Sequence, residues 1–280
     1  MEIVQYSFFI NATVAITLIS IVAGVVGAYI VSRRMLFITG GITHTSFGGL
    51  GLGVYLGLSP TITALVFALA SAFGIEALSQ RKRVREDSAI AVFWALGMAL
   101  GVIFIYITPG YNAGLTGFLF GDILTITLKD LIIYTTYTIL VLILFTIYRK
   151  EILYTAFDRE FAKIQGVKVQ FIEYVAMIVI SLAIILTVKL IGIMLLLSFL
   201  SLPQMSAELF TRNYNKIVLL SIFISFTGGL SGLLLSAFVN VPTSATIVFV
   251  LVLIYAILWA LKKITALQRI KEQCSIKRVS

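Results

Sequence analysis

Long apolar segments separated by short polar ones run through the whole chain. They fall at about 6–31, 35–58, 60–79, 88–108, 128–148, 170–188, 190–210, 217–238 and 243–261. An apolar run of roughly 20 residues is long enough to cross a bilayer as an α-helix. A helix in lipid satisfies its own backbone hydrogen bonds, and the short alternating segments of a transmembrane barrel do not occur here. The pattern predicts an all-α polytopic membrane protein with eight or nine transmembrane helices.

Two parts of the pattern leave the number of spans between eight and nine. Segment 113–127 is apolar but short, which is typical of a re-entrant or interfacial helix. Predicted spans 170–188 and 190–210 are separated by little more than Val188 and Lys189, so a broken helix is the alternative there. Pro203 breaks or kinks the second of these spans, because proline has no backbone N–H and clashes with the preceding turn.

Basic residues follow every odd-numbered span and are nearly absent after the even-numbered spans. The first cluster is Arg33 and Arg34, and the last lies beyond residue 261. Because cytoplasmic loops are enriched in Lys and Arg, this alternation places the C-terminus in the cytoplasm. With nine spans the N-terminus lies outside. The expected location is the inner, cytoplasmic membrane of the cell.

Composition agrees with this class and excludes others. Hydrophobic residues make up 60% of the 280 residues, charged residues 12%, and the mean hydropathy is +1.08. The net charge of +9 is divided among short clusters between apolar spans, which indicates contact with lipid and no nucleic-acid partner. Cys274 is the single cysteine, so neither an intramolecular disulfide nor a CxxC motif exists.

The chain has no recognisable catalytic unit. It contains no G-x-x-x-x-G-K-[ST] motif, so nucleotide-driven work requires a partner that binds ATP. Its longest polar stretch between spans, 149–168, is too short to fold alone. No cluster of acid, base and nucleophile shares one face. We expect a non-enzymatic membrane domain over 1–262 and a basic cytoplasmic tail over 263–280.

The second span contains the only histidine, within the run GGITHTSFGGLGLG at 40–53. Residues four apart share a face of a helix. The span therefore carries a small-residue stripe formed by Gly41, Thr45, Gly49, Gly53 and Gly57. Small residues at this spacing let two membrane helices approach closely, so the span is expected inside the bundle.

His44 lies near the middle of this span, beyond the easy reach of either interface. An ionisable residue at this depth usually faces protein or a water-filled path, and neutral imidazole is a common ligand of transition metals. One histidine is not a tight metal site, but a transient waypoint needs fewer ligands. The alternative is structural, with a neutral imidazole that bridges helices through Thr43, Thr45, Ser46 or a neighbour.

The polar stretch 157–168 predicts a short, well-delimited helix on the cytoplasmic side. Asp158 is a candidate N-cap, Glu160 lies in the first turn, Lys163 lies later, and Gly166 supplies the stop. Phe161 and Ile164 share one face. Such a helix can rest on lipid, fit a groove on a partner protein, or merely connect two spans.

Six segments together resemble the permease subunits of the ABC importers for zinc, manganese and iron, the ABC-3 family. They are GGITHTSFGGLGLG at 40–53, REDSAIAVFWALGMALGVIFI at 85–105, TPGYNAGLTGFLFGDILTIT at 108–127, FDREFAKIQGVKV at 157–169, VKLIGIMLLLSFLSLP at 188–203 and SGLLLSAFVNVPTSATIV at 231–248. Each segment is weak evidence alone, but the ordered set is specific and covers nearly the whole chain.

The resemblance implies a permease bundle like that of the cobalamin-type (type II) importers. Two copies of the permease pair around a central path, two cytoplasmic ATPases bind ATP, and an extracytoplasmic binding protein delivers the metal. The helix at about 157–166 is then the coupling helix, with Asp158, Glu160, Phe161, Lys163, Ile164 and Gly166. No cofactor is held permanently, and the cargo is a divalent transition metal, zinc or manganese first and iron next. His44 is then a transient contact on the path.

The chain departs from the family pattern at one position beside His44. Members usually carry an acidic residue one helical turn before this histidine, where Gly40 stands here. The usual proline after it is also missing. A carboxylate beside the imidazole would hold a divalent cation better than imidazole alone.

Two other kinds of transporter therefore stay open. One is a permease of the same architecture for a siderophore, haem or cobalamin, which would suit a wider and less polar path. The other is a secondary transporter, although that class usually has mid-membrane charges for coupling and this chain has none.

Overall fold

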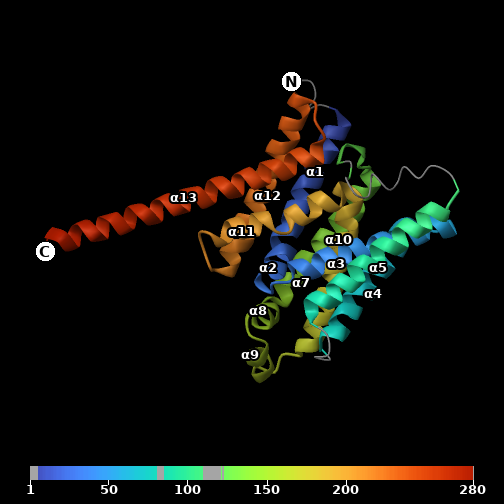
Figure 1. The fold of residues 1–280 in the computed structure, drawn as a ribbon, viewed down its shortest axis with the longest axis horizontal. Coiled ribbons are helices and arrows are strands. Elements are labelled where there is room, and N and C mark those ends of the chain that lie inside the picture. Colours follow the sequence, from blue (N-terminus) through green and yellow to red (C-terminus); the bar gives the residue numbers. More distant parts are fainter. Residues whose placement is uncertain (1–5, 81–84, 110–120, 122, 280) are drawn as a thin grey trace.

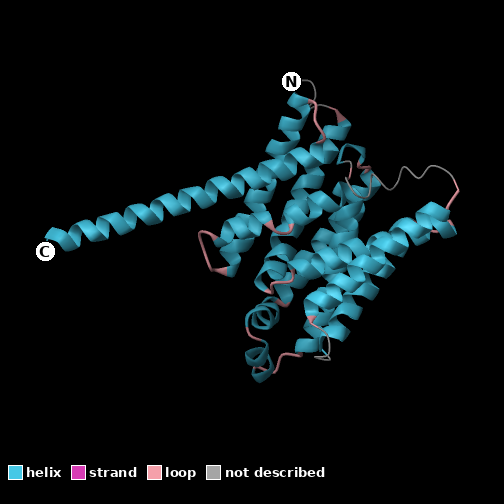
Figure 2. Ribbon diagram, viewed as in Figure 1, coloured by secondary structure: helices cyan, strands magenta, loops and turns pink. Residues whose placement is uncertain are grey.

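A computed structural model describes residues 6–80, 85–109, 121 and 123–279, and all regular structure in these ranges is helical (Figure 2). The first half contains α1 (Ser7–Val22), the π-helix η2 (Ala23–Gly27), α2 (Ala28–Ser32), α3 (Leu36–Leu56), α4 (Pro60–Gln80) and α5 (Glu86–Ile107). The second half contains the 3-10 helix η3 (Ile123–Thr125), α7 (Leu128–Ile147), α8 (Arg149–Phe157), α9 (Arg159–Ile164), α10 (Val169–Phe199), α11 (Leu202–Glu208), α12 (Tyr214–Val239) and α13 (Thr243–Val279). The predicted all-α membrane bundle is confirmed.

The predicted number of spans is slightly wrong. Within the described residues, seven helical segments are long and apolar enough to cross a membrane. Predicted spans 170–188 and 190–210 belong to one 40-residue segment, Val169–Glu208. Predicted span 35–58 forms the 21-residue helix α3, which is not among the seven segments. These two differences account for the change from nine to seven.

The long segment after residue 168 is interrupted twice. Gly192 in α10 has φ 77° and ψ 171°, which is not helical and lies in a region that glycine alone adopts readily. A Cβ on Gly121 would meet the carbonyl group of Ile191 and the backbone N of Gly192, so the chain before η3 packs directly on this break. The second interruption follows Phe199, and Pro203 lies in the first turn of α11, as its missing N–H allows.

The core of the bundle is built from α1, η2, α10 and α12. Ile16, Ile184, Ile191 and Phe199 are among the largest side chains that are fully buried. The buried Gln204 amide on α11 donates to the carbonyl oxygens of Ala23, at 2.6 Å, and Phe199, at 3.2 Å. Ala23 is the first residue of η2 and Phe199 is the last residue of α10, so regular α-helical hydrogen bonding changes at both. The Gln204 amide donates to these two carbonyl groups.

The two ends of the bundle differ in structure. Helices α8 and α9 lie at the bottom of the view in Figure 1, far from the N-terminus at the top. Lys189 pairs with Asp130 at 2.6 Å near the start of α7, where the Thr127 hydroxyl and Asp130 form a capping box. Helix α13 leaves the bundle as a single helix with no break at residue 262, so the division into 1–262 and 263–280 stays a prediction (Figure 1). Predicted segment 113–127 lies mostly outside the described residues.

Candidate functional site

Helix α3 packs closely on both α4 and α5, and its glycines make this possible. A Cβ on Gly49 would meet the Thr63 carbonyl oxygen and lie 2.9 Å from the Ala64 Cα, both on α4. On the same side, a Cβ on Gly53 would lie 2.9 Å from the Pro60 Cα. A Cβ on Gly41 would lie 2.8 Å from the Ile90 side chain of α5. Real Cβ atoms do not approach other atoms so closely, so a larger residue would separate these helices.

Gly57 has a different role from the one that the stripe predicts. It is the C-cap of α3 with φ 67°, and a Cβ there would meet no atom within 4 Å. Its backbone conformation, not close approach of a helix, accounts for the glycine.

A second line of close contact, which the predicted stripe does not include, joins α3 and α5. A Cβ on Gly48 would lie 2.8 Å from the Gly97 carbonyl oxygen, and a Cβ on Gly51 would lie 2.7 Å from that of Gly101. The two glycines of α5 are four residues apart, and this small-residue spacing is the signal in the sequence that could have indicated the contact.

A hydroxyl group also joins α3 to α5. The Thr45 hydroxyl donates to the Gly41 carbonyl oxygen of its own helix at 2.7 Å and to the Phe93 carbonyl oxygen of α5 at 2.9 Å. With the facing glycines, this bond makes the α3–α5 interface as tight as the α3–α4 interface.

Replacing Gly49 with Val is expected to lower the thermal stability of the detergent-solubilised protein. The added side chain would meet the α4 backbone, and overpacking of a filled interface costs typically about 1–3 kcal/mol. Ala70→Val is the control, because it places the same valine side chain at an exposed position on α4. The packing role is contradicted if both variants melt at the temperature of the unmodified protein.

The imidazole of His44 is stacked on the indole of Trp94 from α5. The ring centroids are 4.1 Å apart and the planes differ by 13°. Trp94 is 36% exposed and His44 is partly exposed, so the pair lies at a surface of the bundle formed by α3 and α5. Trp94 lies in segment 85–105, one of the six that carry the family resemblance, but the sequence alone does not pair it with His44.

The Nδ1 atom of His44 is buried and has no hydrogen-bond partner. Thr43, Thr45 and Ser46 do not bridge to it, because each hydroxyl donates to a backbone carbonyl. No group of three or more His, Cys, Asp or Glu side chains gathers here or elsewhere in the described part of the chain. His44 is therefore a single, unsatisfied donor or acceptor rather than a member of a closed metal site.

The space beside Gly40 is occupied by the same tryptophan. A Cβ on Gly40 would lie 3.1 Å from Cζ3 of Trp94. A carboxylate at this position would require the indole to shift. Gly40 and Trp94 therefore fit each other, and an aromatic face lies beside His44.

The predicted short helix is present as α9, with the predicted signals at both ends. The Asp158 carboxylate accepts from the backbone N of Phe161 at 2.9 Å, and Glu160 lies in the first turn. Gly166 has φ 77°, and its N–H donates to the Lys163 carbonyl oxygen at 3.0 Å. These are the N-cap and left-handed C-terminal glycine of an independently terminated helix.

Helix α9 is anchored at Phe161 and open at Ile164 on the same face. The Phe161 ring packs edge-on against Tyr154 of α8, with centroids 5.2 Å apart. Ile164, one turn later, is 81% exposed. Glu160 and Lys163 pair with each other at 2.8 Å on the helix surface. The exposed Ile164 with flanking charges is the composition of a surface that docks on another protein.

A family model described as "ABC 3 transport family" matches residues 5–262. The chain belongs to this family. The predicted resemblance is thereby confirmed over nearly the whole sequence.

Curated relatives of this ABC 3 family member have similar length. An uncharacterized membrane protein of Synechocystis sp. is 33% identical over 262 residues, which is 94% of this chain and 93% of the relative. The manganese transport system membrane protein MntC of Listeria innocua is 29% identical and covers 91% of each chain. The manganese import system permease protein ScaB of Streptococcus gordonii is 30% identical over 90% of this chain and 91% of its own.

Two solved structures share the fold of this ABC 3 family member. PsaBC from Streptococcus pneumoniae, in complex with Fab, gives a TM-score of 0.83 at 29% identity over 92% of this chain and 93% of its own. An ABC transporter described as metal-chelate type, in an inward-facing conformation, gives a TM-score of 0.72 over 92% of this chain and 87% of its own. At 15% identity the second likeness concerns the fold alone.

Proposed function

We propose that this chain is the membrane-spanning permease of an ABC importer for divalent transition metal ions, with manganese as the first candidate. The observation that carries the proposal is the family match over residues 5–262, together with relatives that are described as manganese transport proteins. Zinc and iron follow manganese, because the names of these relatives favour it. Because the chain has no Walker motif, ATP hydrolysis would reside in a partner subunit.

The proposed machine contains other subunits on both sides of the membrane. A cytoplasmic ATPase docks on α9 as the coupling helix, through Asp158, Glu160, Phe161, Lys163, Ile164 and Gly166. A second copy of the chain completes the path, and an extracytoplasmic protein delivers the metal. Both termini of α9 are capped, so the helix is held as a rigid contact, which is what transmission of force requires.

The His44–Trp94 surface is the proposed metal contact within the membrane. His44 is partly exposed at this surface and would offer one ring nitrogen, and Trp94 holds the ring in place. A neutral imidazole is a fitting ligand for manganese or zinc, and a single ligand releases what it binds. With two copies around the path, each would contribute one such nitrogen.

Competition for uptake tests the nature of the cargo. Cells that express this chain with the other proteins of its transport system are expected to take up radioactive manganese. A tenfold excess of unlabelled manganese should suppress uptake more than zinc or iron, and a ferric siderophore should leave it unchanged. If the ferric siderophore suppresses manganese uptake and the free metal ions do not, the cargo is a metal chelate. Uptake that persists without the ATPase would indicate a secondary transporter.

A further inference from the structure

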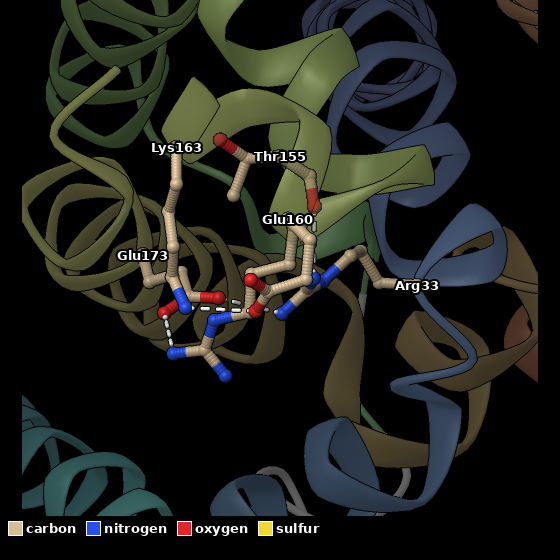
Figure 3. A network of polar contacts seen from close by, with 6 residues as sticks. Arg33, Thr155, Glu160, Lys163 and Glu173 are labelled. Atoms are coloured by element: carbon tan, nitrogen blue, oxygen red, sulfur yellow. Dashed lines mark hydrogen bonds and ion pairs between the residues drawn. The ribbon is translucent and has the colours of Figure 1, made fainter. Parts of the chain in front are cut away.

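Glu173 joins the proposed coupling helix to the membrane bundle. One oxygen of its carboxylate accepts from Arg159, the first residue of α9, at 2.6 Å. The other oxygen accepts from Arg33, which follows α2, at 3.0 Å. Arg33 also donates to the Thr155 carbonyl oxygen of α8 at 2.9 Å (Figure 3). One carboxylate on α10 therefore connects α2, α8 and α9.

The Glu173 carboxylate is buried, so water cannot take the place of a lost partner. Glu173 is 6% exposed, whereas the side chains of Arg33 and Arg159 are 23% and 40% exposed. A buried carboxylate is retained only when charges or donors surround it, and removing one member leaves a buried charge without its partner. The other ion pair of α9, Glu160 with Lys163, lies on the surface within the helix and does not connect it to another element.

The network is also incompletely satisfied. Two guanidinium groups share the one carboxylate of Glu173. The Nε atoms of Arg33 and Arg159 are buried without hydrogen-bond partners. Each arginine makes a single contact to Glu173 rather than a paired fork, which is the weaker and more easily exchanged geometry. The ion pairs of Glu173 therefore hold α9 in place and can also exchange partners when α9 moves.

We propose that Glu173 is the positioning residue through which displacement of α9 is transmitted to α10 and α2. The proposal rests on the proposed function of α9 as the ATPase contact. Helix α10 continues without a break from Glu173, in its second turn, to Gly192, so movement at Glu173 reaches the middle of the bundle along one element. The apolar contact of Phe161 with Tyr154 holds α9 to α8, whereas among the described residues the ion pair of Arg159 is the charged contact that joins α9 to α10.

The test measures manganese transported per ATP hydrolysed by the purified complex in proteoliposomes. Arg159→Ala removes the arm to α9 and leaves Glu173 paired with Arg33, so the fold is preserved. We expect ATP hydrolysis to continue while manganese uptake per ATP falls about fivefold or more, the scale of a modest coupling free energy. Arg159→Lys keeps a single charged donor within reach and is expected to restore most of the ratio.

Lys168→Ala is the matched control, because it removes one cation between α9 and α10, and Lys168 forms no ion pair with a described residue. An Arg159→Ala complex with the ratio of the unmodified protein overturns the proposal. The proposal is also overturned if Arg159→Lys lowers manganese uptake per ATP as much as Arg159→Ala does, since the positive charge would then be irrelevant. Failure of the proposed function looks different, because the unmodified chain would then retain no ATPase or import no manganese.

Discussion

Replacing Ile164 with Asp is expected to abolish manganese uptake and to release the ATPase from the purified chain. Ile164 is the most exposed apolar side chain of α9, with 81% of its surface open. A helix that docks in a groove depends on few apolar anchors, and loss of one costs about 2 kcal/mol or more, roughly 30-fold in affinity. A carboxylate in place of the anchor adds the cost of burying a charge. Co-purification of tagged chain and ATPase gives the measurement.

Gln170→Asp is the control for this variant. It adds the same charge at an exposed position in the first turn of α10, where a carboxylate is favourable to the helix. ATPase retention should remain as in the unmodified chain. Equal loss with both variants would indicate a general effect of charge on this surface, and retention by the Ile164 variant would mean that α9 is only a connecting helix.

Replacing His44 with Ala is expected to lower manganese uptake about tenfold without lowering the amount of protein in the membrane. Substitution even of groups that only support a metal ligand typically costs about 10- to 100-fold. Since Nδ1 of His44 has no protein partner, the imidazole contributes little to packing through hydrogen bonds. Initial rates of uptake at limiting manganese give the measurement.

Thr43→Val is the control, because the Thr43 hydroxyl is buried and donates to the Thr39 carbonyl oxygen of its own helix. Its uptake should stay close to that of the unmodified chain. If His44→Ala transports normally but melts at a lower temperature, the histidine is a packing residue that is stacked on Trp94. The glycines of α3 would then form a helix interface with no path beside it.

Signals within one local stretch predict α9 well. Asp158, Glu160 and Gly166 act through bonds to residues three or fewer positions away, so the pattern contains nearly all the information. Apolar spacing likewise predicts an all-α bundle. It overestimates the spans because the predicted boundary at Lys189 lies inside α10, and because predicted span 35–58 is not among the seven segments.

Contacts between distant segments are beyond the reach of these signals. His44 and Trp94 are 50 positions apart, and only the crossing of α3 and α5 stacks their rings. Glu173 and Arg33 are separated by 140 positions. In the sequence Glu173 is a carboxylate near a span end that could snorkel to the interface, whereas the packing of α2, α8 and α10 buries it. Pairing across a bundle depends on helix order, which periodicity does not determine.

Reconstitution with defined components tests the central claim most directly. The purified chain with its ATPase is placed in proteoliposomes, with the metal-loaded binding protein outside and ATP inside. Manganese is expected to accumulate only when ATP and the binding protein are both present, and His44→Ala is expected to reduce the rate. Manganese entry that is independent of ATP, or an absence of entry with all components present, would contradict the central claim.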